Sequence, residues 1–363
     1  MAPDLPSPSG GIKVIYNFVA HLVALGYDAR VWHGTPGFRY ADWDSPAPVE
    51  TGRTVTAAPG DLLVMPETGG GKWSFLNPAV PHVMLCQGMD FVFMDAEFTR
   101  DVPGAYPGWP QAVATIGISD AIVTFLERAC VPGFPIHAVP VEIESYFVPV
   151  EKERRIALMP RRRREDLLGA VQLVRRSGGL RRPDGDWEIV LIDGMTQAQV
   201  AQELGRSAIF LFGAEREGIG LPGAEAMAAG CYVVGFTGDG AKEYLTPDVA
   251  SVILDSDVVG MCDATLAAMA AFETDRAAWQ GRVDLGRARV LEKHSSTAVR
   301  AALEATFAQL DAPGSPARLA APATVQHYMA HGPRGGRAGA AYVQARKLAR
   351  RSLDRFTTHE QAV

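Results

Sequence analysis

The sequence predicts an α/β protein with two parallel-sheet domains, because short apolar runs of strand length alternate with segments of helical periodicity from residue 12 to residue 310. At 363 residues, the chain also has the length of two such domains. We expect domains at 1–148 and 149–310, followed by a Pro-, Gly- and Ala-rich tail at 311–363. The clearest strand–turn–helix unit lies in the second domain.

This unit combines a strand, a glycine-rich turn and a helix. Residues 208–212 form an apolar run typical of a buried strand, and residues 221–229 indicate a helix that ends at a glycine. In a parallel sheet, the turn between them lies at the carboxyl ends of the strands, where ligands bind, and the helix N-terminus offers free N–H groups to an anion. Glu217 in the turn and Glu225 on the helix can accept hydrogen bonds from hydroxyl groups of a sugar or a ribose. The alternative is an ordinary helix start with two solvated carboxylates.

Residues 217–230, EGIGLPGAEAMAAG, resemble the paired-glutamate motif (Glu-x7-Glu) of retaining glycosyltransferases. These are enzymes of the large "group 1" family, with two Rossmann-like domains facing across a cleft, the GT-B fold. The resemblance spans residues 9–310 and is most specific at 155–166 and 209–245. It implies that Glu225 binds the ribose of a nucleotide and that Glu217 binds a sugar hydroxyl. It also implies donor contacts from the residues between them at the helix mouth, Gly218, Ile219, Gly220 and Leu221.

The first domain is expected to begin with the pair Gly10-Gly11, a helix over residues 12–25 and a strand at 29–33. The pair resembles the Gly-Gly loop of GT-B transferases, whose amides approach the donor phosphate or the acceptor. A plain pair of helix-capping glycines is the alternative.

A central strand of the first sheet is missing from the sequence. In a Rossmann unit a strand precedes the first helix, but residues 1–9 contain three prolines, which lack the N–H group that a sheet needs. We therefore expect that the natural chain starts upstream, or that its start is misassigned. The first sheet of this chain should then have a gap or a poorly paired centre.

The strand predicted at residues 81–88 carries Gln87 at its end. In related transferases this strand end often carries a His or a Gln that faces the donor sugar, so the resemblance implies this role for Gln87; a satisfied loop amide is the alternative. The glycine-rich loop at 68–72 is either an acceptor-side loop or a plain turn. The aromatic-rich stretch at 73–109 is either acceptor surface or, more often for such residues, core.

Four consecutive arginines, residues 161–164, follow the first strand predicted in the second domain. A guanidinium group forms paired hydrogen bonds with phosphate oxygens, so this turn suits a diphosphate. The family places a basic pair here, and we favour Arg161 and Arg162; a surface run of charge is the alternative. Residues 235–245 resemble the family's next glycine-rich turn and the glutamate that follows it.

Composition restricts the partners. The net charge of −6 argues against a general nucleic-acid binder. The four cysteines lack metal-ligand spacing and are expected to be reduced core residues of a cytoplasmic protein.

Residues 318–363 hold eight basic and two acidic side chains, and residues 340–356 suit a basic amphipathic helix. This end of the chain is either a solvated tail or a weak contact with a partner or the inner membrane face.

The resemblance implies a hexosyl-type glycosyltransferase that moves a sugar from a nucleotide-diphosphate donor to an acceptor hydroxyl with retention, as in polysaccharide biosynthesis. The acceptor would be a carbohydrate, a lipid-linked sugar or another glycan. The resemblance implies neither a cofactor nor a metal. Two alternatives stay open: a nucleotide-sugar epimerase on the same fold, and a binding protein that retains the nucleotide site without turnover.

Overall fold

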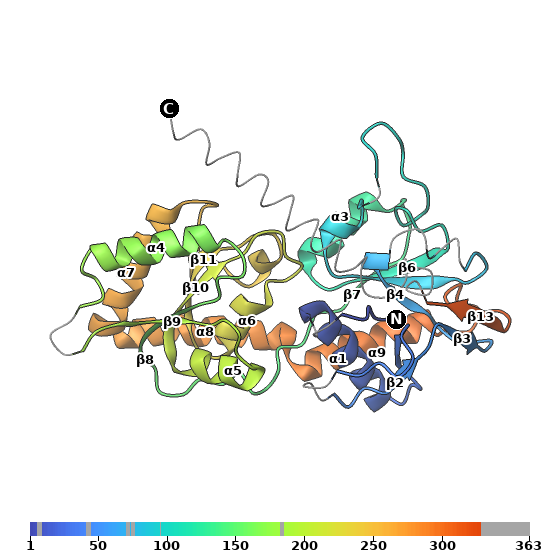
Figure 1. Ribbon diagram of the computed structural model, residues 1–363, viewed down its shortest axis with the longest axis horizontal. Coiled ribbons are helices and arrows are strands. Elements are labelled where there is room, and N and C mark those ends of the chain that lie inside the picture. Colours follow the sequence, from blue (N-terminus) through green and yellow to red (C-terminus); the bar gives the residue numbers. More distant parts are fainter. Residues whose placement is uncertain are drawn as a thin grey trace.

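The computed structural model describes residues 1–5, 9–40, 45–69, 73, 77–94, 96–181 and 185–327. These residues form two lobes that lie side by side (Figure 1), each built around parallel strands. The first lobe contains the strands up to residue 138, and the second contains those between residues 153 and 253.

The second lobe contains a five-stranded parallel sheet with the order β12-β11-β10-β8-β9. Its strands are β8 (Glu153–Leu158), β9 (Glu188–Leu191), β10 (Ser207–Gly213), β11 (Tyr232–Phe236) and β12 (Ser251–Ile253). Its helices are α4 (Arg164–Arg176), α5 (Gln197–Arg206), α6 (Leu221–Ala228), α7 (Val258–Thr274) and α8 (Arg276–His294).

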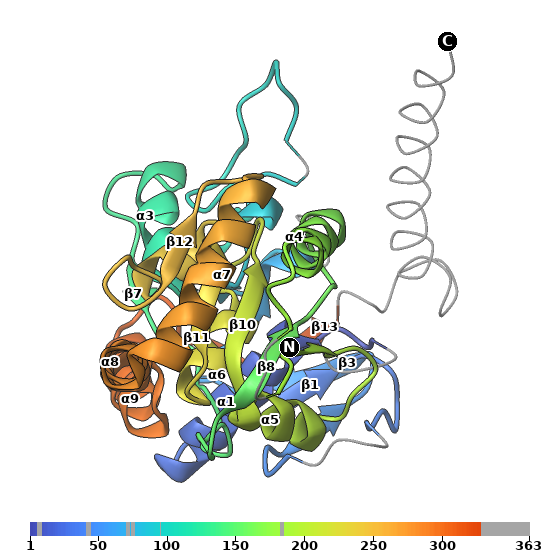
Figure 2. The same cartoon turned by 90° about the vertical axis from the view of Figure 1, so that its left-hand side faces the viewer.

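β10 is the central strand of this sheet, and all seven of its residues are buried. Because successive side chains of a strand point to opposite faces, Ile209 and Leu211 pack with α4 and α7, whereas Phe210 and Phe212 pack with α5 and α6. Figure 2 shows these helix pairs on the two sides of the strands. The core on the side of α6 continues into the first lobe, so the two lobes share apolar packing.

The first lobe contains a four-stranded parallel sheet and a separate parallel pair of strands. The sheet consists of β4 (Val64–Pro66), β5 (His82–Cys86), β6 (Ala112–Gly117) and β7 (Ile136–Ala138), and the pair of β1 (Val31–His33) and β2 (Val49–Thr51). Its first helices are α1 (Gly10–Ala24) and α3 (Asp120–Ala129). Ser9 and Ser119 cap them by accepting hydrogen bonds from backbone N–H groups.

The centre of the first sheet is poorly paired, as predicted. Residues 1–5 form no strand, and β1 and β4 belong to separate sheets. The first residues nevertheless form backbone hydrogen bonds with both neighbouring segments. Ala2 N donates to Trp32 O at 2.9 Å on one side, and the Met1 amino group donates to Val64 O at 2.9 Å on the other. Residues 1–4 thus lie in the slot with one backbone hydrogen bond to each neighbour.

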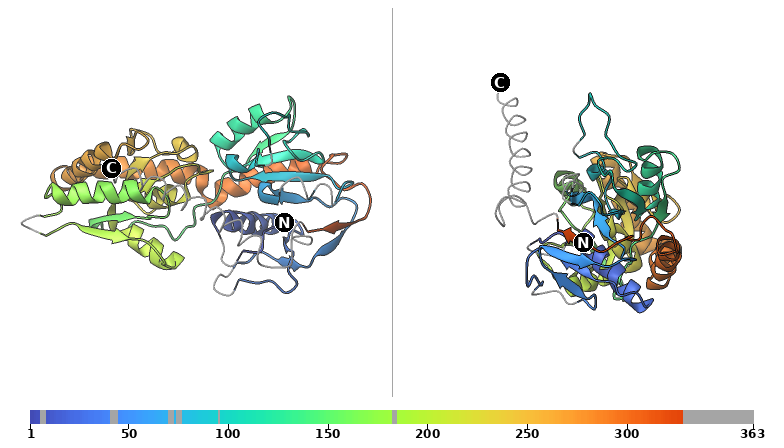
Figure 3. Two further views of the ribbon diagram at one scale, coloured as in Figure 1. Left: turned by 45° about the horizontal axis from the view of Figure 1, so that its top comes forward. Right: turned by 90° about the vertical axis from the view of Figure 1, so that its right-hand side faces the viewer.

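The chain returns to the first lobe after α8, which corrects the prediction that a tail begins at residue 311. In α9 (Ser296–Leu310), the Phe307 ring lies 5.7 Å from the Tyr27 ring, which follows α1. β13 (Ala323–Gln326) then pairs antiparallel with β3 (Thr54–Ala57). Figure 3 shows β13, in red, in the same lobe as the blue N-terminal elements. Residues 340–356, where a basic helix is predicted, lie outside the described residues.

Two further features of the fold are the state of the cysteines and the apolar character of the helices. All four cysteines, Cys86, Cys130, Cys231 and Cys262, are buried and unpaired, as expected of core residues. Within the described ranges, no helix combines the length and the apolar character that crossing a membrane requires.

We predict that ending the chain at Leu310 destabilises the first lobe. The buried side chains of Leu319 and Val325 would be lost, and Trp73 Nε1 would lose its hydrogen bond to Gln326 O, which is 2.9 Å long. Burying one such aliphatic side chain contributes about 1.5–3 kcal/mol, so the free energy of unfolding should fall by about 3–6 kcal/mol. Urea denaturation followed by tryptophan fluorescence measures this change. A chain ending at residue 335, which keeps β13, is the control; identical curves for the two truncations would contradict the prediction.

Candidate active site

The turn between β10 and α6 is closely packed around Gly220. This residue has a positive φ of 74°, and a Cβ atom on it would lie 2.8 Å from Phe212 Cζ. The Tyr244 hydroxyl donates a 2.6 Å hydrogen bond to the Gly220 carbonyl. Only glycine suits such a position. α6 begins at Leu221 with a proline in its first turn, as predicted, so the turn holds Glu217 at the carboxyl end of β10.

Glu217 faces the arginine run. Its side chain is 16% exposed, and its Oε1 atom lies 3.2 Å from Arg162 Nε. Burial raises the pKa of Glu217, and the neighbouring Glu215 raises it further, while Arg162 and Arg161 lower it. The ion pair with Arg162 therefore orients the Glu217 carboxyl group, while burial and the arginines have opposite effects on its pKa.

Glu225, in the middle of α6, is 9% exposed. Burial and the nearby Glu144 carboxyl group raise its pKa to about 7, although Lys13 and Arg161 act in the opposite direction. None of the described residues donates a hydrogen bond to its carboxyl group. A buried acid without a donor is well suited to accept hydroxyl groups from a ligand.

Lys13 and Glu144 are two charged neighbours of Glu225 that our sequence analysis did not identify. Lys13 lies on α1, one turn after Gly10, and Glu144 lies in the segment that connects the lobes. Burial lowers the pKa of Lys13, and Glu144 and Glu225 partly restore it. Burial likewise raises the pKa of Glu144, and the charge of Lys13 lowers it. Lys13 could have been found from its position one helical turn after Gly10, because residues one turn apart lie on the same face of a helix.

The glycines predicted from both halves of the sequence meet at one place. A Cβ atom on Gly10 would lie 3.3 Å from Leu221 Cδ1, and one on Gly11 would lie 3.1 Å from Gln87 Oε1. A Cβ atom on Gly218 would lie only 2.1 Å from Gln87 O. The loops of the two lobes thus approach each other closely because these residues lack side chains.

Ile219 has a buried side chain, so a contact between this residue and a ligand would involve its backbone. The predicted second glycine-rich turn lies against it: a Cβ atom on Gly240 would be 2.5 Å from Ile219 N and 2.3 Å from Gly218 O. Gly240 N also donates to Glu217 O at 3.1 Å. The two glycine-rich turns of the second lobe therefore form one packed unit.

The four arginines have different surroundings. Arg161 and Arg162 are exposed on the side of the glutamates, whose pKa values both respond to Arg161. Arg163 turns away: it has a positive φ of 49°, and it pairs with Asp166 at 3.1 Å and with Asp255. The geometry thus agrees with the choice of Arg161 and Arg162, while their role stays a prediction.

Glu67 is a buried acid that our sequence analysis also missed. It follows β4 directly, is 1% exposed, and accepts a 2.9 Å hydrogen bond from Gln87 N. Burial raises its pKa to about 7. Its Oε2 atom and Gln87 Oε1 are both buried without a hydrogen-bond partner among the described residues. Glu67 therefore supports the backbone of the loop that touches Gly218.

Two further expectations concern the first lobe and metals. The loop at 68–72 lies largely outside the described residues. Of the aromatic stretch, Trp73, Tyr106 and Trp109 are buried core residues, whereas Phe98 is exposed. Across the described part of the chain, no group of three or more His, Cys, Asp or Glu side chains is arranged to hold a metal ion.

Comparison with known proteins supports the fold. No protein-family model matches the sequence. An alpha-1,6-glucosyltransferase of Actinobacillus pleuropneumoniae serotype 7 (strain AP76) is 37% identical over 106 residues, which are 29% of this chain and only 32% of that protein. Sucrose-phosphate synthase from Thermosynechococcus elongatus has a similar structure, with a TM-score of 0.63 and 16% identity over 85% of this chain and 99% of that chain. The chain has the predicted α/β fold with two Rossmann-like domains, GT-B.

We predict that Glu67→Gln stabilises the protein more at pH 8 than at pH 5. The unfolded side chain loses its proton near pH 4.5 and the folded one near pH 7, so the folded state binds more protons between these values and becomes less stable as pH rises. Gln keeps the acceptor for Gln87 N but cannot ionise. The gain in unfolding free energy should differ by about 3 kcal/mol between the two pH values.

Denaturant unfolding at both pH values measures this difference, with Glu127→Gln on the exposed face of α3 as the control. A gain for Glu67→Gln that is the same at pH 5 and pH 8 would show that the buried carboxyl group does not titrate in this range.

Proposed function

We propose that this chain is a retaining glycosyltransferase that transfers a sugar from a nucleotide-diphosphate donor to a hydroxyl group of a glycan acceptor. One observation carries the proposal: the half-buried Glu217 and the buried Glu225 lie on either side of the N-terminus of α6, and Arg162 Nε lies 3.2 Å from Glu217 Oε1. The carboxyl edge of a parallel sheet thus combines carboxylates, which can bind hydroxyl groups, with cations, which can bind phosphates.

Each charged group has a part in the proposed reaction. Glu225 accepts hydrogen bonds from the ribose and Glu217 from a hydroxyl group of the donor sugar. Arg161, Arg162 and the N-terminus of α6 bind the diphosphate and stabilise its charge as it leaves. The bond from the anomeric carbon to the diphosphate breaks, and a bond to the acceptor oxygen forms on the same face of the sugar. The acceptor proton passes to the leaving phosphate oxygen.

The named relative supports the class of reaction. That protein is called an alpha-1,6-glucosyltransferase, and the match supports a hexosyl donor here, although it covers a third of the relative. The structural likeness to sucrose-phosphate synthase supports the fold on which such transfer takes place, and fold alone does not define the chemistry. We further propose a cytoplasmic location with nucleotide sugar as the donor and no added cofactor, in keeping with four free, buried cysteines.

A donor panel tests the proposal. Nucleoside diphosphates and their sugar conjugates should raise the melting temperature, because a ligand that binds only the folded state stabilises it. Adding a glycan acceptor should release nucleoside diphosphate and a glycosylated product with retained anomeric configuration. An isomerised nucleotide sugar without acceptor would instead identify an epimerase, and binding without turnover would identify a binding protein.

We predict that Glu217→Gln and Glu225→Ala each reduce transfer by about 10- to 100-fold, since each removes a carboxylate acceptor and a hydrogen bond to such a group contributes about 1.5–3 kcal/mol. Glu225→Ala should also weaken nucleotide binding, whereas Glu217→Gln should leave it largely intact. Product formation and isothermal titration calorimetry separate the two effects. Normal turnover in both folded variants would rule out this site.

We predict that the double change Arg161→Ala and Arg162→Ala weakens binding of a nucleoside diphosphate by about 100-fold and binding of the nucleoside much less, because charge-assisted hydrogen bonds to phosphate are lost. The matched control is the double change Arg175→Ala and Arg176→Ala, two exposed arginines at the opposite end of α4. Titration calorimetry with both ligands measures the difference. An equal loss for nucleoside and diphosphate would indicate that Arg161 and Arg162 are surface charge only.

A further inference from the structure

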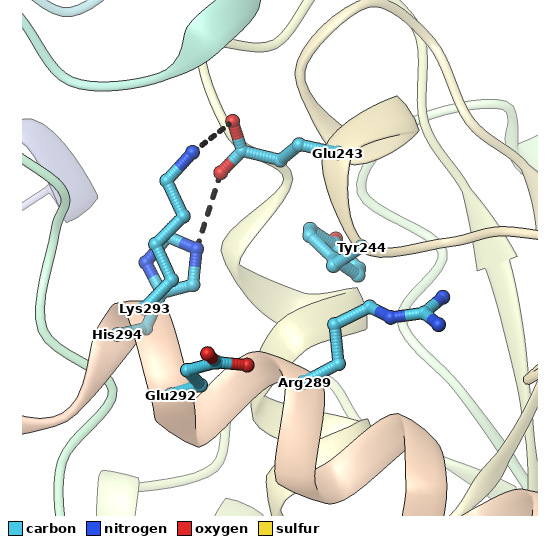
Figure 4. A pocket seen from close by; sticks show the side chains of 6 residues that line it. All are labelled: Glu243, Tyr244, Arg289, Glu292, Lys293 and His294. Carbon is cyan, nitrogen blue, oxygen red and sulfur yellow. Dashed lines mark hydrogen bonds and ion pairs between the residues drawn. The ribbon is translucent and has the colours of Figure 1, made fainter.

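The Glu243 carboxylate receives hydrogen bonds from two other parts of the molecule. It ends the short helix η3 (Gly240–Glu243), and its side chain is only 6% exposed. Its Oε2 atom accepts from Asp120 N at 2.9 Å and from Lys293 Nζ at 3.1 Å, and its Oε1 atom lies 3.1 Å from His294 Nε2. Figure 4 shows Lys293 and His294 reaching this carboxylate from the end of α8, beside a cavity of about 300 Å³.

These donors belong to separate structural units. Asp120 is the first residue of α3 in the first lobe, where backbone N–H groups lack partners within the helix. Glu243 therefore acts as an additional cap from the other lobe, and its negative charge suits the positive end of the helix dipole. Lys293 strengthens the contact by lying 2.7 Å from Asp120 Oδ1.

His294 links the same carboxylate to the segment that connects the lobes. Its Nδ1 atom lies 2.8 Å from Val141 O, and its own carbonyl accepts from Ile143 N at 2.9 Å. Each ring nitrogen of His294 thus faces one oxygen acceptor, the Val141 carbonyl on one side and the Glu243 carboxylate on the other. Burial raises the pKa of Glu243, but the hydrogen bonds from His294 and Asp120 and the charge of Lys293 outweigh it and keep the pKa low.

The helix η3 packs directly against the turn that carries Glu217. Gly240, its first residue, donates to Glu217 O at 3.1 Å and leaves no room for a side chain next to Gly218 O. Gly218 in turn contacts Gln87 of the first lobe. A displacement of η3 would therefore shift the glutamate-bearing turn relative to the first lobe.

We propose that Glu243 is a positioning residue that clamps the first lobe and the connecting segment onto the glycine-rich turns of the second lobe. If the proposed function is right, this clamp keeps the acceptor side and the donor side at the spacing that sugar transfer requires. The inference concerns domain arrangement first, so it can be tested without any substrate.

The structural test measures the distance between the lobes by pulsed electron paramagnetic resonance. Spin labels are placed at Glu127→Cys on α3 and Arg175→Cys on α4, both exposed, while the native cysteines are buried. The labelled protein with Glu243 intact should give a narrow distribution of distances between the two labels. Glu243→Gln, which keeps the size of the side chain but loses its charge, should broaden it. Glu292→Gln, on the wall of the same cavity, is the matched control and should not.

Lys293→Met is the second variant, and it tests the clamp if Glu243→Gln does not fold. It should broaden the distribution as well, because it removes the contacts of Lys293 with both Glu243 and Asp120. The effects of the two changes should add up to less than their sum in the double variant, because both remove the Lys293–Glu243 ion pair. An unchanged, narrow distribution in a folded Glu243→Gln or Lys293→Met variant would overturn the clamp.

The kinetic test separates positioning from general stability. The turnover number should fall by at least tenfold, as expected for a lost charge-assisted hydrogen bond, while affinity for a nucleoside diphosphate changes less. An affinity loss as large as the loss of turnover would argue against positioning. If the wild-type protein transfers no sugar but the distance distribution still broadens, the proposed function fails and the clamp stands.

Discussion

The backbone contact between Gly218 and Gln87 is the constraint on which the rest of the site depends. A side chain on Gly218 would place its first carbon 2.1 Å from Gln87 O, so the two lobes reach this separation only because the residue is glycine. Two acids near this contact are buried: Glu67, which accepts a hydrogen bond from Gln87 N, and Glu225 on the helix that follows the turn. Burial disfavours charge, which is why the pKa values of both acids rise to about 7.

The parts of this arrangement that could be predicted from sequence are those that a local pattern determines. The apolar run of β10, the glycine turn and the start of α6 have recognisable periodicity and turn residues, and the structure places them as expected. The pair Gly10-Gly11 was recognisable for the same reason. The choice of Arg161 and Arg162 over Arg163 agrees with the geometry, but sequence alone could not exclude Arg163, whose direction depends on distant Asp255.

The parts that could not be predicted depend on contacts between distant segments. Glu67 and Glu144 are single acids outside the motifs that the sequence analysis identified, and only their burial in the folded chain raises their pKa values. The return of the chain to the first lobe was missed because β13 is short and rich in small residues, and its pairing partner β3 lies more than 250 residues earlier. A sequence pattern reports local preference, and these positions are determined by tertiary packing.

The charge balance of the site favours an anionic ligand despite its acids. Near neutral pH the Glu225 carboxyl group is close to its pKa, so a substantial fraction carries no charge and does not repel a phosphate. A protonated acid can also donate a hydrogen bond, which widens the range of hydroxyl contacts it can make. Arg161 and Arg162 remain charged under all such conditions. Burial of the acids and exposure of the arginines therefore act together: an approaching diphosphate meets fixed positive charge at the rim, and neutral or hydrogen-bonding groups behind it.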